Sequence, residues 1–481
     1  MARKDWLWAL LLASAWVALV RPGPLDLPYW WDEADVYVPG SQWVAEHNLD
    51  VTPGVFPDDY SRGHPILLYL LAGAAFRAFG PEPTVGHLVV LPFTALALAF
   101  TYLLGAQLAG RRVGFGAAAL LASSPLFMAI GNMLLPELPL TALAALSLYA
   151  YARGRLGWAV LAGCAAVWVK ETGVFSAAAI AGAELWMALP LAHHRWTERR
   201  SHLRGFAFAC VPIGALVVFF LWQKAHAGYF IFPHHADLFV ERPLGLSNLA
   251  TVWPSLLGWH GRWIALTAAA LLWGWAWLRG RGSARTWLGA SEREAVVVAI
   301  VLLVLGNFVF FTKMFWLERY ALPAHPGVAV LLAAALLRGP SPRLGTAALG
   351  LSLGVGLASL HAPTSSDAEE HTFAYADAIA SHRRVYEPVL AHPDPTVLAP
   401  WPMQIELRSP YLGYVDRPVR TIHPRSWHGE AVDFVLFGAE SRRAPELRAL
   451  ARRQGFVRLR SVRVGVAQPM ELWGRAPEDR D

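Results

Sequence analysis

The sequence predicts a polytopic membrane protein that is mainly α-helical, and three observations lead to this fold class. Of its 481 residues, 55% are hydrophobic and only 16% are charged, which is too apolar for an ordinary soluble domain. Apolar runs close to the length of a membrane-spanning helix recur up to about residue 360. After that point the chain becomes polar, with Arg and acidic residues in balance. We therefore expect a membrane domain at 1–361 and a small soluble α/β domain at 362–481.

Eleven apolar runs are candidate membrane spans. The first, 6–20, follows Arg3 and Lys4 and resembles a signal peptide, in which Ala13-Ser14-Ala15 would be a weak cleavage site. Because many apolar runs follow it, we favour an uncleaved signal-anchor helix. The other ten runs lie at 84–109, 113–130, 138–152, 156–169, 173–192, 205–223, 263–278, 294–312, 322–337 and 344–360.

A shorter apolar run at 65–79 decides the orientation of all later spans. Lys and Arg gather in the cytoplasmic loops of membrane proteins. If 65–79 does not span, most basic residues of the membrane domain fall on the same side as the N-terminus, and that side is cytoplasmic. The loops concerned are 110–112, 153–155, 193–204, 279–293 and 338–343.

If 65–79 did span, every later loop would change sides and the charge bias would be lost. We therefore predict that 65–79 is a juxtamembrane or re-entrant helix within a long first outer segment, 21–83. Because eleven spans starting from a cytoplasmic N-terminus end on the outer side, the 362–481 domain is predicted to lie outside. Within it, 396–407, 432–437 and 456–466 read as strands, and 443–454 reads as a helix.

Charge and cysteine content exclude several other classes of protein. The net charge is +6, but the basic residues are distributed through loops, so they do not indicate a nucleic-acid partner. The two cysteines, Cys164 and Cys210, lie in apolar runs and form neither a disulfide framework nor a CxxC site. An acidic cluster could take a divalent ion, although no ligand pattern demands a metal. His325 reads as a packed, hydrogen-bonded residue, and the pairs His193-His194 and His234-His235 are placed on opposite sides of the membrane.

The acidic residues of the membrane domain fall on the predicted outer face. Three of them, Asp32, Glu33 and Asp35, lie in the stretch YWWDEADVY, 29–37, directly after the first span. Adjacent residues such as Asp32 and Glu33 point in different directions, so one carboxylate can serve chemistry while the other holds structure. The Trp and Tyr residues around them read mainly as anchors in the membrane interface. The remaining outer acids are Glu137, Glu171 and Glu318.

Few basic residues share that face, and several lie close to the acids in the sequence. Cations at the membrane surface suit a phosphate whose lipid tail remains in the bilayer. Each alone is more often a residue whose charged end reaches the interface. Together with the acids, however, they predict a site that holds an anionic lipid headgroup beside a general base. The candidates are Arg62, His64, Lys170, Lys313 and Arg319.

Several motifs, in order, resemble those of the GT-C glycosyltransferases, particularly the protein O-mannosyltransferases and the bacterial aminoarabinose transferases of lipid A. WDEADVY is similar to the Asp-Glu motif of their first outer loop. SRGHPILLYLLAGAAFRAFG resembles their HPPL segment, and LPFTALALAFTYLLGAQLAGRRVG the next span. The approach to a second acid in the family is similar to SSPLFMAIGNMLLPELP. A "LxKxTG" region of the family is similar to LAGCAAVWVKETGVF, and a "RYxLPxxPxxxLL" span is similar to ERYALPAHPGVAVLLAA. The likeness covers roughly residues 6 to 340.

The resemblance implies a fold of about 11 transmembrane helices of GT-C type, with juxtamembrane helices in the first outer loop. It also implies a hexosyl- or pentosyltransferase that uses a polyprenyl-phosphate sugar as donor. The acceptor would be a protein or a glycolipid on the periplasmic side of a bacterial inner membrane. Carried over to this chain, the catalytic acids would be Asp32, Glu33 and Glu137. The residues that hold the lipid phosphate and sugar would be Arg62, His64, Lys170, Arg319 and Tyr320.

The chain departs from the family pattern at three places. Ile66 stands where the second Pro of HPPL is expected, and Glu137 stands where Asp is commoner. Pro39-Gly40 is expected to interrupt a helix that starts at Glu33. These departures bear on the sugar of the donor and on the identity of the base.

Two alternatives remain from other functional classes. A transporter or flippase for a lipid-linked or anionic solute would place ionisable residues in mid-membrane, at broken helices. An inactive relative that acts as a binding partner would have no need to keep both the acids and the cations. The concentration of charged residues at the outer helix ends favours an enzyme.

Overall fold

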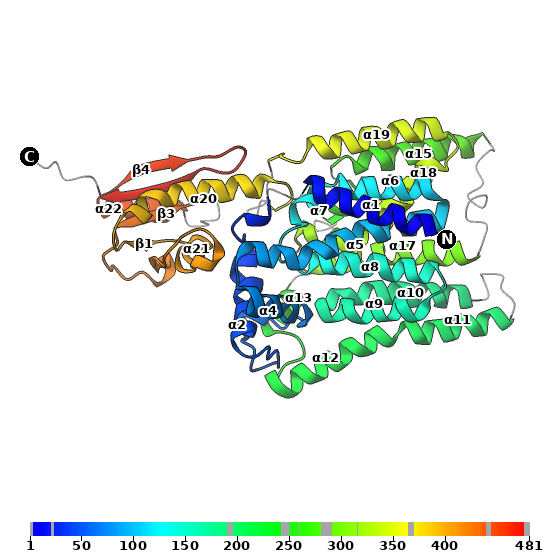
Figure 1. The fold of residues 1–481 in the computed structure, drawn as a ribbon, viewed down its shortest axis with the longest axis horizontal. Helices are drawn as coiled ribbons and strands as arrows, with labels where there is room; N and C mark the ends of the chain where they lie inside the picture. The colour runs from blue at the N-terminus through cyan, green and yellow to red at the C-terminus, as the bar shows by residue number, and fades with distance from the viewer. Residues whose placement is uncertain are drawn as a thin grey trace, which may run out of the picture.

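The computed structural model describes residues 3–20, 24–189, 196–241, 250, 252–258, 260–279, 291–314, 316–363, 370–438 and 444–475. A bundle of long helices forms one end of the molecule, and a unit that contains the β-sheet forms the other (Figure 1). His193 and His194 lie outside the described residues, as do parts of the basic loops 193–204 and 279–293.

A helix lies at each of the eleven predicted apolar runs. Among the described residues, four helical segments are long and apolar enough to cross a membrane by length and composition: 83–109, 199–227, 293–313 and 318–337. In chain order the bundle helices are α1 (Arg3–Val20), α5 (Pro83–Ala109), α6 (Arg111–Ala122), α7 (Pro125–Ile130), α8 (Glu137–Ala152), α9 (Leu156–Val169), α10 (Val174–Ala188), α11 (Trp196–Ala209), α12 (Val211–Ala227), α15 (Arg262–Leu278), α17 (Ser291–Lys313), α18 (His325–Leu337) and α19 (Pro342–Ala358).

The run predicted at 113–130 is divided into α6 and α7. Ser123 and Ser124 separate the two helices, and Pro125 opens α7. Proline is tolerated in the first turn of a helix, where its missing N–H has no intrahelical partner in any case. The chain therefore bends at this point and continues as a second helix.

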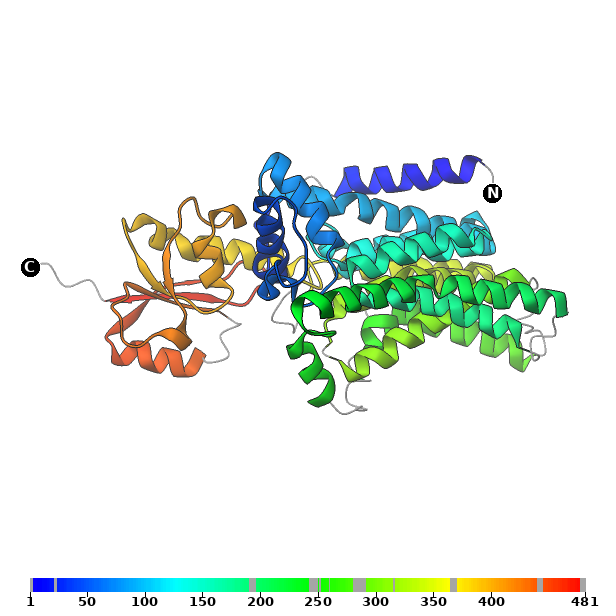
Figure 2. The ribbon, with the colours of Figure 1, turned by 90° about the horizontal axis from the view of Figure 1, so that it is seen from below.

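The first long loop, which precedes α5, is largely helical. Its elements are η1 (Pro24–Asp26), η2 (Glu33–Tyr37), α2 (Val38–Glu46), α3 (Asp58–Ser61) and α4 (Leu67–Phe79). The expected interruption at Pro39 does not occur, because Pro39 falls in the first turn of α2, directly after the π-helical turn η2. Both α2 and α4 lie at the end of the bundle, between the bundle and the C-terminal unit (Figures 1 and 2).

The C-terminal unit is a mixed five-stranded sheet with flanking helices. Its strands are β1 (Thr396–Leu398), β2 (Arg420–Ile422), β3 (Phe434–Phe437), β4 (Phe456–Val462) and β5 (Met470–Arg475), in the order β2-β1-β3-β5-β4. β1 runs parallel to β2 and β3, whereas β5 is antiparallel to β3 and β4. The helices are α20 (Ala374–Ala391), α21 (Met403–Arg408) and α22 (Ala444–Arg453).

The sequence prediction for this unit is correct in part. The strands near 432–437 and 456–466 and the helix near 443–454 are present. The long strand predicted at 396–407 is wrong, since β1 ends at Leu398 and α21 follows. Pro400 and Pro402 lack the N–H needed to continue a strand ladder. The sequence analysis also missed α20, β2 and β5.

The aromatic residues before Asp32 join the two ends of the molecule. The backbone N–H of Tyr29 donates to the carbonyl of Leu412 at 3.0 Å. The ring of Trp30, which is 1% exposed, lies 5.1 Å from the His382 ring of α20. These contacts correct the interpretation of the aromatic residues as interface anchors, because they are buried in a core that is continuous with the C-terminal unit.

A further ring contact joins the same stretch to the C-terminal unit. The rings of Trp31 and Trp401 lie 4.5 Å apart at 77°, in an edge-to-face arrangement, which is a favourable geometry for aromatic pairs. Trp31 adopts a left-handed backbone with φ of 53°, a conformation that is uncommon for a bulky residue. The stretch that carries the first acidic motif is therefore held by contacts with three residues of the C-terminal unit, Leu412, His382 and Trp401.

Candidate active site

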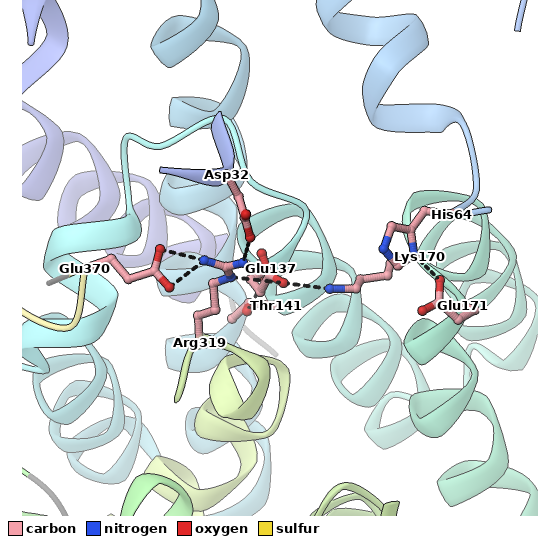
Figure 3. Close-up of polar contacts among 8 residues, drawn as sticks. All are labelled: Asp32, His64, Glu137, Thr141, Lys170, Glu171, Arg319 and Glu370. Carbon is pink, nitrogen blue, oxygen red and sulfur yellow. Dashed lines mark hydrogen bonds and ion pairs between the residues drawn. The ribbon is translucent and has the colours of Figure 1, made fainter. Parts of the chain in front are cut away.

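Arg319 is the centre of a buried ion-pair cluster built from four separate segments (Figure 3). It belongs to η6 (Glu318–Ala324), just before α18, and its side chain is 2% exposed. Its Nη1 donates to both carboxylate oxygens of Glu370, at 2.5 and 2.6 Å, and its Nη2 donates to Oδ2 of Asp32. Its Nε lies 3.7 Å from Oε1 of Glu137. The guanidinium is thus enclosed by three carboxylates.

Lys170 extends the cluster through Glu137. Its Nζ donates to Oε1 of Glu137 at 2.9 Å, and both side chains are buried. The same ammonium lies 4.4 Å from the centre of the Tyr320 ring, and the Arg319 guanidinium lies 5.5 Å from that ring. Tyr320 therefore forms an aromatic wall for both cations, an arrangement that favours cations electrostatically.

Helix termini position these side chains. Glu137 is the first residue of α8, where a negative charge is favoured by the helix dipole. One turn later, the Thr141 hydroxyl donates to the Glu137 carbonyl at 2.6 Å. Lys170 follows the last residue of α9 with an extended backbone, and Arg319 lies before α18. The cluster is therefore assembled at the ends of helices.

The carboxyl groups of the cluster outnumber its basic groups. The carboxyls belong to Asp32, Glu137 and Glu370, and the basic groups to Arg319 and Lys170. Buried charges are tolerated only where they are paired, and each cation here already has carboxylate partners. An incoming phosphate could reach Arg319 only by displacing one of those carboxylates. This geometry makes Arg319 an organiser of the acids.

Asp32 and Glu33 point in different directions and have different surroundings. Glu33 is 1% exposed; its Oε1 accepts the backbone N–H of Leu134, and its Oε2 accepts that of Trp30 at 3.2 Å. His87 Nε2 lies 3.4 Å from the same carboxylate. The Asp32 side chain is 20% exposed and meets the Arg319 guanidinium. Glu33 is thus tied to the backbone inside the protein, whereas Asp32 reaches the surface of the cluster.

His64 and Glu171 form a second pair beside the cluster (Figure 3). Nδ1 of His64 lies 2.9 Å from Oε2 of Glu171. Burial alone would raise the pKa of the Glu171 carboxyl, but His64 and then Lys170 lower that pKa to about 2. The His235 ring lies 5.1 Å from the His64 ring. The pKa of His235 is lowered to about 4, mainly by burial and secondly by repulsion from His64.

Arg62 and Asp35 form the most exposed pair of the region. Arg62 Nη2 donates to Asp35 Oδ2 at 2.8 Å. Burial raises the pKa of the Asp35 carboxyl, an effect that Arg62 opposes. Asp32 and Asp35 therefore do not act on one partner, because Asp32 meets Arg319 while Asp35 meets Arg62.

One residue of the cluster, Glu370, was not predicted from the sequence. It lies in the run DAEEHTF, where nothing in the sequence separates it from the neighbouring acids. The following residue also makes an ion pair, since Nδ1 of His371 contacts Oε2 of Glu318. Two adjacent residues, Glu370 and His371, thus pair with two adjacent residues, Arg319 and Glu318. A sequence gives no measure of such pairing across a distance of 51 residues.

The described residues contain no group of three or more His, Cys, Asp or Glu side chains arranged to hold a metal ion. The carboxylates of the cluster instead face a guanidinium. His325 is a packed, hydrogen-bonded residue, as predicted: its Nε2 lies 2.8 Å from Arg262 Nη1 and 3.1 Å from the Ser255 carbonyl. Cys164 and Cys210 are free cysteines.

Comparison with known proteins identifies the fold. No family model and no curated protein sequence matches the chain. The structure is similar to the crystal structure of ArnT from Cupriavidus metallidurans bound to undecaprenyl phosphate, with a TM-score of 0.58, 14% identity and coverage of 98% of each chain. The apo state of the same protein gives a TM-score of 0.55 at 15% identity, again over 98% of each chain.

A third similar structure is the apo form of the oligosaccharyltransferase from Archaeoglobus fulgidus. It has a TM-score of 0.50 and 11% identity, and the match covers 90% of this chain and 69% of that one. ArnT and this oligosaccharyltransferase are both GT-C proteins. The match to ArnT spans the helical bundle and the C-terminal unit together, so the chain shares the fold of ArnT, in agreement with the GT-C resemblance of its motifs.

Proposed function

We propose that this protein is a membrane glycosyltransferase that moves a sugar from a polyprenyl-phosphate donor to an acceptor hydroxyl. The fold is shared with ArnT, whose crystal structure contains undecaprenyl phosphate, a lipid of the donor class that the motifs imply. The observation that carries the proposal is the partly exposed carboxylate of Asp32 at the edge of a buried ion-pair cluster that also contains Lys170. Such an arrangement combines a base with groups that stabilise a leaving phosphate.

Asp32 is the proposed base. It takes the proton from the acceptor hydroxyl as the acceptor oxygen forms a bond to the anomeric carbon of the donor sugar. The bond from that carbon to the phosphate oxygen breaks, and the phosphate leaves with the electron pair. A single displacement of this kind inverts the configuration at the anomeric carbon. A general base within hydrogen-bond reach contributes about 10²- to 10⁴-fold to such a step.

The leaving phosphate is proposed to lie on the side of the cluster that His64, Lys170 and Arg62 form. His64 is 15% exposed and is held through Nδ1 by Glu171, which leaves its other ring nitrogen to face a ligand. Arg62 has the most exposed cationic side chain of the set, at 37%. Cations placed where negative charge develops lower the barrier to phosphate departure. Arg319 is assigned to the support of Asp32.

Glu137 is proposed as a secondary acid that contacts the sugar or the acceptor. One of its oxygens, Oε1, is used by Lys170. The other, Oε2, is buried and has no hydrogen-bond partner within the described part of the chain. A buried carboxylate oxygen without a partner is costly, and a substrate hydroxyl would satisfy it.

The site is proposed to open on the periplasmic side of a bacterial inner membrane. The bias of basic residues toward the opposite loops supports this orientation. The acceptor is then a protein or a glycolipid of the cell envelope, and the C-terminal unit lies on the same side as the site.

A transporter or flippase is the alternative in a different class. Transport sites are expected near the middle of the membrane, at broken helices. Here Glu137 begins α8, Lys170 follows the end of α9, and Arg319 precedes α18. Charged residues at the helix ends fit chemistry at the membrane surface better than passage through it.

The experiment that tests the proposal is a transfer assay. Purified full-length protein is incubated with a panel of radiolabelled polyprenyl-phosphate sugars and with native envelope acceptors. Incorporation of label into an acceptor is the expected result. Movement of the labelled lipid across a vesicle bilayer without transfer to any acceptor would instead support the transporter.

A further inference from the structure

We propose that Glu370 is a positioning residue for the transfer reaction: it fixes the guanidinium of Arg319, which holds Asp32 in place, so the segment leading into the C-terminal unit completes the active site. This inference rests on the proposed function. It assigns a positioning role in the reaction to a part of the chain that lies beyond the region of motif resemblance.

The contacts of Glu370 with Arg319 are the first evidence. Both Glu370 oxygens accept from the same nitrogen, Nη1, at 2.6 Å or less. Asp32 accepts from the other terminal nitrogen, Nη2. Because a guanidinium is planar and rigid, a carboxylate that fixes one terminal nitrogen also fixes the direction in which the second one points. Glu370 therefore determines where Arg319 presents its N–H to Asp32.

The surroundings of Glu370 favour support over direct chemistry. Its side chain is 1% exposed, whereas that of Asp32 is 20% exposed. Both of its oxygens are also taken by Arg319, so neither is left to meet an acceptor hydroxyl. Its effect on the reaction must pass through Arg319, the residue that it touches.

A second ion pair anchors the same segment. The next residue, His371, contacts Glu318 through Nδ1. The two adjacent pairs, Glu370 with Arg319 and His371 with Glu318, fix the segment to η6 at two consecutive positions. A segment held at two positions has little freedom to shift, so Glu370 can hold its geometry while substrates bind and leave.

The helix that follows reaches the acidic motif from another direction. In α20, His382 lies against the Trp30 ring, and Trp30 precedes Asp32 by two residues. His382 is itself fixed, since its Nδ1 lies 2.7 Å from Oε2 of Glu406 and the Tyr386 hydroxyl donates to the same oxygen at 2.6 Å. Asp32 is thus supported twice, through Trp30 by α20 and through Arg319 by Glu370.

The loss of the Glu370 charge should be felt at Asp32. With Glu370→Gln, Arg319 keeps Asp32 on Nη2 but has no anion on Nη1, so the guanidinium is free to rotate toward the remaining carboxylates. A displacement of about 1 Å in a catalytic arrangement can reduce the rate on the order of 100-fold. The donor phosphate is assigned to the His64 side, so donor binding should change little.

The test compares three full-length variants in the transfer assay. Glu370→Gln removes the charge at the site, and Glu370→Asp keeps the charge on a shorter side chain. The matched control is Glu387→Gln, which breaks an exposed pair with Arg460, 2.9 Å apart, in the same C-terminal unit. We expect Glu370→Gln to lower kcat by about 10- to 100-fold with the KM for the donor unchanged, Glu370→Asp to recover part of the loss, and Glu387→Gln to behave like the parent.

The outcomes separate this inference from the proposed function. If the parent transfers sugar and Glu370→Gln matches it in kcat, the positioning role is wrong while the glycosyltransferase stands. A rise in donor KM with kcat unchanged also overturns it, because Glu370 would then act in donor binding. If Glu370→Gln unfolds, Glu370→Asp decides: folded protein with the parental kcat despite the shortened side chain contradicts the proposal. Absence of transfer by the parent points instead to failure of the proposed function.

Discussion

Asp32 and Arg319 lie 287 positions apart in the sequence and meet as an ion pair in the folded protein. The pair joins the segment that follows α1 to η6, just before α18. It also distinguishes Asp32 from Glu33, since the latter is occupied by backbone N–H groups. The sequence presents two adjacent acids of similar chemistry, and the structure gives each of them a different partner.

The first prediction concerns Glu33 and the stability of the fold. The two oxygens of the Glu33 carboxylate accept the backbone N–H groups of Leu134 and Trp30. Glu33→Gln leaves only one oxygen to accept, and it removes the charge beside His87. We expect a loss of about 1–3 kcal/mol of stability, as for other buried polar groups left without a partner. Thermal unfolding in detergent measures it. A Gln variant as stable as the parent, but without transfer activity, would assign the chemistry to Glu33 instead.

The second prediction concerns the buried pair of Lys170 and Glu137. Lys170→Met leaves Glu137 as a buried charge with only a distant contact to Arg319, at 3.7 Å. Removal of one partner of such a pair costs about 3–5 kcal/mol, whereas replacement of both by apolar residues is often neutral. We therefore expect Lys170→Met to be strongly destabilised and the double variant Lys170→Met/Glu137→Leu to recover most of the stability.

Both variants of this pair should lack transfer activity, since both remove groups assigned to the site. The measurement is a double-mutant cycle of unfolding midpoints. The cycle also needs the single variant Glu137→Leu. If the double variant lost as much stability as the two single variants together, direct pairing in the folded protein would be contradicted.

The third prediction concerns the pH dependence of stability through Glu171. The pKa of this carboxyl is lowered from its usual 4.5 to about 2 in the folded state, against the effect of burial, by His64 and Lys170. A lowered folded-state pKa contributes stability that is present above the usual pKa and is lost as the pH falls toward the folded value. The parent should therefore lose stability between about pH 4.5 and pH 2 more steeply than Glu171→Gln. The same slope in both proteins would show that the pair contributes nothing.

The fourth prediction concerns the side of the membrane on which the C-terminal unit lies. Protease added outside intact cells, with the outer envelope made permeable, should cleave within 362–481. The exposed arginines of β4 and α22, such as Arg458 and Arg453, are suitable sites for trypsin. Cleavage only after the inner membrane has been lysed would contradict the proposed orientation and place the C-terminal unit in the cytoplasm.

The helices of the bundle were predictable because long apolar runs have few alternatives to a helix in a membrane. All eleven runs contain one, and the shorter run at 65–79 forms α4. The break between α6 and α7 was not predicted, although Pro125 carried a signal for it. In the C-terminal unit, short strands such as β2 have too few residues to show a period.

The site residues were predictable as a set, but their pairing was not. Asp32, Glu137, Lys170 and Arg319 do come together. The cations were predicted to hold a phosphate, and the sequence did not show that Arg62, His64, Lys170 and Arg319 would each also lie beside a carboxylate. Pairing depends on which helix ends meet, and residue types alone do not encode that. The burial of Trp30 was not predicted for a similar reason, because the sequence does not distinguish a Trp that anchors in the membrane interface from a Trp that packs in a core.

The role of Asp32 as the base is tested most directly by the rate of sugar transfer by Asp32→Asn. The donor is the polyprenyl-phosphate sugar that the parent uses, and the variant must be shown to insert and unfold like the parent. We expect a loss of about 10²- to 10⁴-fold in kcat, the contribution of a general base, with donor binding retained. Transfer by Asp32→Asn at the parental rate would contradict the assignment of Asp32 as the base.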